Sequence, residues 1–121
     1  MFEKNLSLSR LIGFYGELLS ERQKEICTLY YDDDLSLAEV AEIVGISRQG
    51  VRDALKKSEA NLREIDDKLH LPDVFDERNR LLADIVRRLD TVKSAVHDKS
   101  ALDTLEEALS DARKLLSKEV L

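Results

Sequence analysis

The chain is short and acidic, and its composition excludes several classes of protein. It has 121 residues, 43% of them hydrophobic, with 19 lysines and arginines against 25 aspartates and glutamates, for a net charge of −6. This length fits one domain or a small domain with an appendage, and the acidic balance confines any contact with a polyanion to a local patch. A single cysteine, Cys27, excludes an internal disulfide. The opening stretch lacks the apolar core of a signal peptide, and no run approaches the roughly 18 apolar residues of a membrane span, so we expect a soluble, cytoplasmic protein.

Helical periodicity extends along the whole chain. The sequence contains one proline and four glycines, and its apolar residues recur every three or four positions rather than alternately. These features predict an all-α fold. The first expected helix covers residues 5–19, and its apolar stripe consists of Leu8, Leu11, Ile12, Tyr15, Leu18 and Leu19.

Two capping boxes predict where the next helices begin. In a capping box, a serine side chain accepts a hydrogen bond from the backbone three residues later, where a Gln or Glu side chain bonds back. Ser20 with Gln23 predicts a helix that runs to Tyr31, and the acidic stretch YYDDDLS ends it. Ser36 with Glu39 predicts the start of another helix.

The stretch SLAEVAEIVGISRQGVRDALKK, residues 36–57, has the spacing of a helix-turn-helix motif. Ala41 is small where a crossing helix must come close, Gly45 can end the first helix in the left-handed conformation, and Ser47 can cap the second helix. The same packing would also serve a helical adaptor domain with no role in nucleic-acid binding. The positions expected to face inward are Leu37, Val40, Ala41, Val44, Ile46, Val51, Ala54 and Leu55.

The exposed face of the second helix has side chains suited to nucleic acid. At 100° per residue, Gln49, Asp53 and Lys56 form its centre. Paired donors of arginine suit guanine or phosphate, the amide of glutamine suits adenine, and lysine suits phosphate. Between residues 47 and 58, four cations and one aspartate give a local charge of +3, although several acidic residues lie nearby in sequence. We therefore expect an isolated protomer to bind DNA weakly and to need dimerisation or a partner. The candidate nucleic-acid-binding residues are Arg48, Gln49, Arg52, Lys56 and Lys57.

A boundary is expected where the helical pattern stops at HLPD, because Pro72 lacks an amide and disfavours helix in the preceding residue. This predicts a helix-turn-helix domain over residues 1–71 and a C-terminal helical hairpin over residues 72–121. The hairpin helices are expected at 74–96 and 101–120, with Ser100 as an N-cap. A seam with steps of three and four (Leu102, Leu105, Leu109, Ala112 and Leu116) requires a packing partner, either the first domain or a second copy of the chain.

The sequence lacks the common patterns of catalytic and metal sites. His70 and His97 have no potential metal ligand at a suitable spacing, and no glycine-rich phosphate loop or nucleophile elbow is present. The three consecutive aspartates at 32–34 are not followed by the ligand ladder of an EF-hand. We expect neither an enzyme nor a bound cofactor or metal ion.

The segment FYGELLSERQKEICTLYYDDDLSLAEVAEIVGISRQGVRDALKKSEANL resembles the YlxM family of bacterial helix-turn-helix proteins. The resemblance covers roughly residues 11–71, with LYYDDDLSLAEVAE and SRQGV in family order. More distantly, the segment is similar to the promoter-reading fourth region of sigma factors. The family resemblance implies a regulatory or accessory role in the signal recognition particle pathway, with DNA, the particle's RNA or particle components as partners. The alternative is a protein–protein adaptor that uses the same helix surface without reading DNA.

Overall fold

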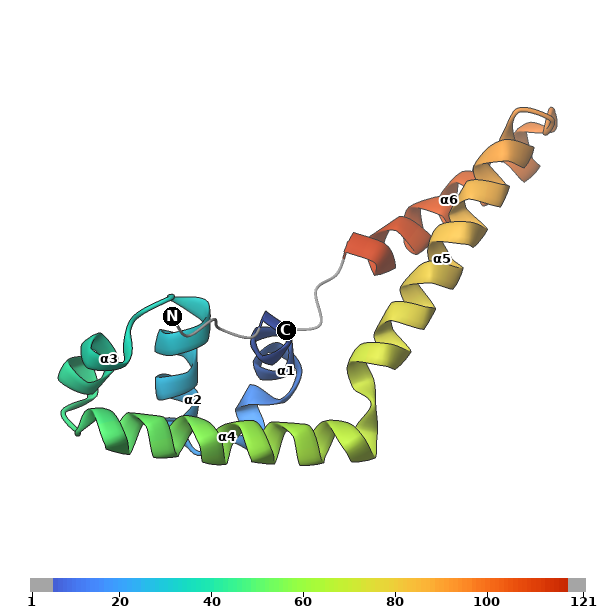
Figure 1. The fold of residues 1–121 in the computed structure, drawn as a ribbon. Helices are drawn as coiled ribbons and strands as arrows, with labels where there is room; N and C mark the ends of the chain where they lie inside the picture. The colour runs from blue at the N-terminus through green and yellow to red at the C-terminus, as the bar shows by residue number, and fades with distance from the viewer. Residues whose placement is uncertain (1–5, 118–121) are drawn as a thin grey trace. The chain divides into compact units, whose positions relative to one another are not determined.

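The computed structural model describes residues 6–117 of the chain, and this part is built from α-helices without any strand. The all-α prediction is therefore confirmed. In chain order the α-helices are α1 (Leu6–Tyr15), α2 (Glu21–Cys27), α3 (Leu37–Val44), α4 (Arg48–Leu69), α5 (Leu71–Lys93) and α6 (Lys99–Ser117) (Figure 1). Backbone contacts divide the chain into two compact units that separate between Pro72 and Asp73.

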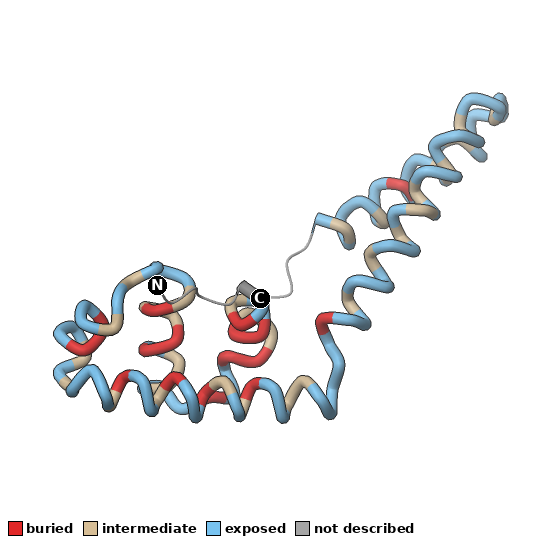
Figure 2. The backbone as a smooth tube through the Cα atoms, in the orientation of Figure 1, coloured by how far each residue is buried: buried red, intermediate tan, exposed pale blue. Residues whose placement is uncertain are grey.

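The N-terminal unit is organised around the long helix α4. Helices α1, α2 and α3 all pack against it, and the buried positions lie on the sides of the helices that face one another (Figure 2). Helix α4 therefore holds the other three helices of this unit in place by packing against each of them. The core consists of Leu8, Leu11, Ile12, Tyr15, Leu19, Ile26, Cys27, Tyr30, Val40, Ala41, Val51, Leu55 and Leu62.

The first predicted helix ends earlier than expected, and Asn5 lies outside the described residues. Helix α1 stops at Tyr15 and is followed by a 3₁₀ turn, η1 (Gly16–Leu18). A 3₁₀ turn winds more tightly than an α-helix, so the apolar stripe cannot continue in register through it. Leu18 is consequently 66% exposed, contrary to the prediction, whereas Leu19 is buried as predicted.

Both predicted capping boxes are present. The side chain of Ser20 accepts a hydrogen bond from the Gln23 amide at 3.2 Å, and that of Ser36 accepts one from the Glu39 amide at 3.1 Å. In each box the Gln or Glu side chain bonds back to the amide of the serine. The helix that begins after Ser20 leaves the α geometry at Thr28 and continues as a π-helical segment, η2 (Thr28–Asp32).

Helix α4 ends at Leu69, as the sequence predicts, but Pro72 does not cause the ending. The helix is closed by His70 in the left-handed conformation (φ 52°), whose amide donates to the Asp66 carbonyl at 2.8 Å. Pro72 instead lies in the first turn of α5, where a missing amide costs no helical hydrogen bond. Helix α5 therefore begins at Leu71, three residues before the expected start.

Tyr15 joins α1 to the end of α4 and the start of α5. Its ring is buried in the core, and its hydroxyl donates to a carboxylate oxygen of Asp66 at 2.8 Å. The same hydroxyl accepts a hydrogen bond from the backbone amide of Leu71 at 3.0 Å. That amide belongs to the first turn of α5 and has no partner within its own helix, so the phenol satisfies a group that the helix leaves open.

Cys27 lies in the core of the N-terminal unit with 1% of its surface exposed. Burial raises the pKa of its thiol, and a hydrogen bond with the Ser58 side chain opposes the shift. Ser58 is itself buried and donates to the Ala54 carbonyl at 2.7 Å, as helical serines commonly do. The thiol therefore belongs to the packing of α2 against α4.

The C-terminal unit contains the predicted hairpin of α5 and α6. Leu109 is buried, and the other members of the predicted α6 seam, Leu102, Leu105, Ala112 and Leu116, are half-buried. Two ion pairs join the helices, between Arg113 and Asp90 at 2.6 Å and between Lys93 and Glu106 at 3.5 Å.

The start of α6 differs from the prediction. Asp98, not Ser100, is the N-cap, because its carboxylate accepts from the Ala101 amide at 2.8 Å. Val120, the expected end of the helix, lies outside the described residues. Among the helices of residues 6–117, none is long and apolar enough to span a membrane.

Candidate nucleic-acid interface

The turn between α3 and α4 has the geometry that the sequence predicts. Gly45 ends α3 in the left-handed conformation (φ 81°), and its amide donates to the Ala41 carbonyl at 2.8 Å. A residue with a side chain is strained in this conformation, so glycine suits the position. Ser47 then caps α4, accepting a hydrogen bond from the Gly50 amide at 2.9 Å. Ala41 and Val51 are buried where the two helices meet, which confirms the helix-turn-helix arrangement.

The candidate nucleic-acid-binding residues all lie on the exposed side of the first turns of α4. The inward positions of the same turns, Val51 and Leu55, are buried in the core, so the outer face is held at a fixed orientation by packing behind it. We call this outer face, formed by Arg48, Gln49, Arg52, Asp53, Lys56 and Lys57, the α4 face.

The cations of the α4 face differ in their ion pairing from those further along α4. Within residues 6–117, none of its arginines and lysines forms an ion pair. About two and three turns further along the same helix, Arg63 pairs with Glu59 at 3.1 Å and Lys68 pairs with Glu64 at 3.5 Å. The α4 face can therefore offer its positive charges to a ligand without breaking an existing ion pair.

One contact on the α4 face was missed by the sequence reasoning. The side-chain amide of Gln49 donates to a carboxylate oxygen of Asp53 at 2.9 Å. The spacing of four residues is the signal that could have revealed it, because such side chains are neighbours on a helix. The bond places a carboxylate beside the amide that was expected to read adenine and uses one of its two N–H donors, so one donor and the amide oxygen remain for a base.

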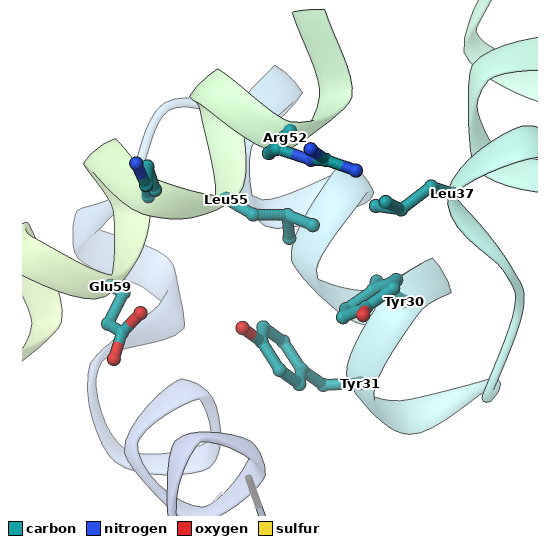
Figure 3. A pocket seen from close by; sticks show the side chains of 7 residues that line it. Tyr30, Tyr31, Leu37, Arg52, Leu55 and Glu59 are labelled. Atoms are coloured by element: carbon teal, nitrogen blue, oxygen red, sulfur yellow. The ribbon is translucent and has the colours of Figure 1, made fainter. Parts of the chain in front are cut away.

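A pocket opens beside the α4 face and was also missed by the sequence reasoning. Figure 3 shows Arg52 and Leu55 reaching from α4 toward Leu37 at the start of α3, with Tyr30 and Tyr31 of η2 opposite them. The pocket has a volume of about 390 Å³. Its complete lining is Tyr30, Tyr31, Leu37, Arg52, Leu55, Lys56 and Glu59.

The two tyrosines of the pocket have altered acidity. Burial, and next the negative charge of Glu59, raise the pKa of Tyr31 to about 12. Burial also raises the pKa of Tyr30, and the guanidinium of Arg52 opposes that shift. The two rings meet edge to face with their centroids 5.0 Å apart. Both phenols are therefore neutral at physiological pH.

The side chains that commonly bind metal ions do not cluster in the described part of the chain. Among residues 6–117, no three or more histidine, cysteine, aspartate or glutamate side chains are placed so that they could hold a metal ion. His70 ends α4 in a left-handed backbone conformation and His97 is exposed beyond the end of α5.

The fold, the capped start of α4 and the exposed α4 face together define a helix-turn-helix protein. A family model described as "Putative helix-turn-helix protein, YlxM / p13 like" matches residues 2–102, and this chain belongs to that family, UPF0122. The match extends beyond residue 71, where the resemblance noted from the sequence ended, and includes α5 and the start of α6.

Curated relatives from several bacilli agree with this membership. A UPF0122 protein of Bacillus mycoides is 46% identical over 89 residues, which cover 74% of this chain and 81% of the relative. One from Bacillus thuringiensis is 48% identical over 83 residues, covering 69% of this chain and 76% of the relative. One from Halalkalibacterium halodurans is 40% identical over 111 residues, covering 88% of this chain and all of the relative.

Proposed function

We propose that this protein is a regulatory or accessory factor that binds nucleic acid through the α4 face. The observation that supports this proposal is the row of cations, without an ion-pair partner in residues 6–117, on the second helix of a helix-turn-helix motif. In proteins with this motif, the second helix enters the major groove and contacts bases with the residues near its N-terminus. Arg48, Gln49 and Arg52 occupy the corresponding turns of α4.

The proposed binding is electrostatic and strongly dependent on salt. If all four cations of the α4 face contact phosphates, the affinity falls with salt concentration with a logarithmic slope of roughly −3.6, which is weak compared with dedicated repressors. We therefore extend the proposal to a homodimer, which doubles the number of contacts. A two-fold dimer would read two half-sites about 34 to 36 Å apart.

The family resemblance adds a cellular context to the proposal, namely the signal recognition particle pathway in the cytoplasm. Two nucleic acids follow from it, duplex DNA and the RNA of the particle. They make different demands, because the major groove of A-form RNA is too deep and narrow for a helix to read its bases. Binding to duplex DNA would use the tip of α4, whereas binding to RNA would use chiefly phosphate contacts.

The test is a titration of labelled duplex DNA and of the particle's RNA at two salt concentrations. We expect the double variant Arg48→Ala/Arg52→Ala to weaken binding by about 1 to 3 kcal/mol for each lost bidentate contact. The matched control is Arg63→Ala/Lys68→Ala, which removes the same number of cations from the paired half of α4. Equal losses of binding free energy in the two double variants would show that the α4 face contributes only nonspecific charge. No loss in either variant would refute nucleic-acid binding by this helix.

The homodimer is tested separately by sedimentation equilibrium of the full chain. We expect association at tens of micromolar, a range suited to weak self-association. A monomer throughout this range would remove the two half-sites from the proposal but leave single-site binding intact.

A second candidate function is a protein adaptor that uses the same surface. It is favoured by Asp53 in the middle of the α4 face and by Ile43, which is 59% exposed on the neighbouring helix α3. A carboxylate repels phosphate but can accept hydrogen bonds from a protein partner, and Ile43 adds one exposed apolar side chain on α3. Asp53→Asn distinguishes the candidates, because it should strengthen binding to nucleic acid and weaken binding to a protein that contacts the carboxylate.

A further inference from the structure

The pocket beside the α4 face combines an apolar floor with charged residues at its rim (Figure 3). Its volume of about 390 Å³ lies in the lower part of the range for small-molecule sites, roughly 300 to 1,000 Å³. Such sites are mostly apolar and have a few polar groups that orient the ligand. Here the floor is made of Tyr30, Tyr31, Leu37 and Leu55, and the charged residues are Arg52, Lys56 and Glu59.

The charges at the rim favour an anion. Glu59 already has a partner, since one of its carboxylate oxygens lies 3.1 Å from Nε of Arg63. Arg52 and Lys56, in contrast, form no ion pair within residues 6–117. An entering carboxylate, sulfonate or phosphate would therefore meet two cations that have no ion-pair partner in this part of the chain and one carboxylate that already pairs with an arginine.

The two tyrosines of the floor belong to an unusual piece of backbone. In η2 the Asp33 amide donates to the Thr28 carbonyl, five residues back, at 3.0 Å. This wider turn rotates consecutive residues less than an α-helix does, which helps to bring the neighbours Tyr30 and Tyr31 into one pocket lining. π-helical turns are rare and occur frequently at functional sites. The π-helical segment η2 is thus a second indication, independent of charge, that the pocket is a binding site.

We infer that this pocket binds a small organic anion. The apolar body of the ligand lies on the tyrosine and leucine floor, and its charged group lies between Arg52 and Lys56. Both cations also belong to the α4 face, so the ligand would compete with nucleic acid for them; this second half of the inference rests on the proposed function. The helix-turn-helix unit would then contain its own effector site.

The first test uses phenylbutyrate as the probe and the full chain as the protein. The chain has three tyrosines and no tryptophan, and two of the tyrosines line the pocket. We expect the ring resonances of Tyr30 and Tyr31 in the NMR spectrum to shift in a saturable manner. The ring resonances of Tyr15, which lies outside the pocket, should not shift and serve as the internal reference. Uncharged phenylbutanol should bind at least about tenfold more weakly, because it cannot form the charge-assisted hydrogen bonds.

Two double variants locate the charged group. Arg52→Met/Lys56→Met removes both rim cations and should weaken probe binding about tenfold. Arg48→Met/Lys57→Met removes two cations of the α4 face that do not line the pocket, and probe binding should be unchanged. Thermal melts of both variants check that the fold is intact. Equal probe affinity in the two double variants would overturn the assignment of the anion to Arg52 and Lys56.

Competition tests the second half of the inference. A saturating concentration of the probe should reduce the salt slope of nucleic-acid binding by about two, one for each cation withdrawn. If the tyrosine resonances do not shift, or shift equally with phenylbutanol, the anion site is refuted whatever the nucleic-acid result. If they shift as expected while no nucleic acid binds at any salt concentration, the anion site stands and the proposed function falls.

Discussion

Arginine and lysine occur along the whole of α4, but their surroundings differ between its two halves. In the first half, Arg52 and Lys56 have no ion-pair partner within residues 6–117, and the helix is capped by Ser47 at a tight turn. In the second half, Arg63 and Lys68 each pair with a glutamate one turn earlier. Exposed pairs of this kind stabilise a helix by only about 0.3 to 0.5 kcal/mol, but they occupy the cation. The first half of α4 is thus a candidate binding surface, whereas the cations of its second half stabilise the helix itself.

The largest expected effect comes from the buried side of the first half. Val51→Asp places an unpaired carboxylate against Ala41 and the α3–α4 turn, in a site that is now completely buried. We expect a loss of at least about 4 kcal/mol, enough to unfold a small domain. Lys57→Asp introduces the same carboxylate on the exposed side and should leave the melting temperature nearly unchanged. Equal melting temperatures for the two variants, measured by circular dichroism, would contradict the packing described for α4.

A smaller effect is expected at the end of the second half. Tyr15→Phe removes the hydroxyl that donates to Asp66 and accepts from the Leu71 amide. A hydrogen bond to a charged group contributes about 1.5 to 3 kcal/mol, and this one is partly buried, so we expect a loss of about 2 kcal/mol in urea denaturation. Asp66→Asn keeps an acceptor for the phenol and should cost less. A larger loss in Asp66→Asn than in Tyr15→Phe would show that the carboxylate stabilises the fold by some other contact.

The direct comparison of the two halves uses single lysines. Lys56→Ala should reduce the salt slope of nucleic-acid binding by about one, since each phosphate contact contributes about that much. Lys68→Ala should leave the slope unchanged, because this lysine is held by Glu64 outside the α4 face. Filter-binding or anisotropy titrations at several salt concentrations measure both slopes. A shared reduction would mean that the contact extends along the whole of α4.

The smallest effect at neutral pH, and the most specific, concerns Tyr31. Its pKa in the folded protein is about 12, against about 10 for an unperturbed tyrosine. Since the folded state holds this proton more tightly than the unfolded state, the stabilisation is complete below pH 10. It is lost as the pH rises through about 12. Urea denaturation between pH 9 and 12 should therefore show that the free energy of unfolding falls as the pH rises. In the Tyr31→Phe variant this free energy should fall less steeply.

The sequence predicted the parts of the fold that depend on local hydrogen bonds. Ser20, Ser36 and Ser47 are N-caps in the structure, and Gly45 adopts the left-handed conformation, because each of these roles is decided within a few residues. The prediction for Leu18 was wrong because a uniform helical period does not anticipate a 3₁₀ turn. The prediction of Ser100 as the N-cap of α6 was wrong because aspartate caps a helix as well as serine does, and Asp98 occupies that position.

The candidate site was predictable only in part. The exposed positions of the α4 face follow from helical periodicity and from the apolar residues behind them. The Gln49–Asp53 bond depends on side-chain rotamers, and the pocket depends on a π-helical segment that no composition signal marks. Tyr30 and Tyr31 looked like the end of a helix in the sequence, and only the three-dimensional arrangement brings them opposite Arg52.

The burial of Cys27 has a practical consequence for measuring how this protein moves. A thiol reacts with disulfide reagents as the thiolate, so a buried thiol of raised pKa is inert until the surrounding core opens. As the chain has a single cysteine, its rate of labelling reports one event, the separation of α2 from α4. Labelling rates compared with and without denaturant would tell whether α2 is released alone or only when the whole N-terminal unit unfolds. The labelling rate of Cys27 in the wild-type chain thus measures how often the core behind η2 and the α4 face opens.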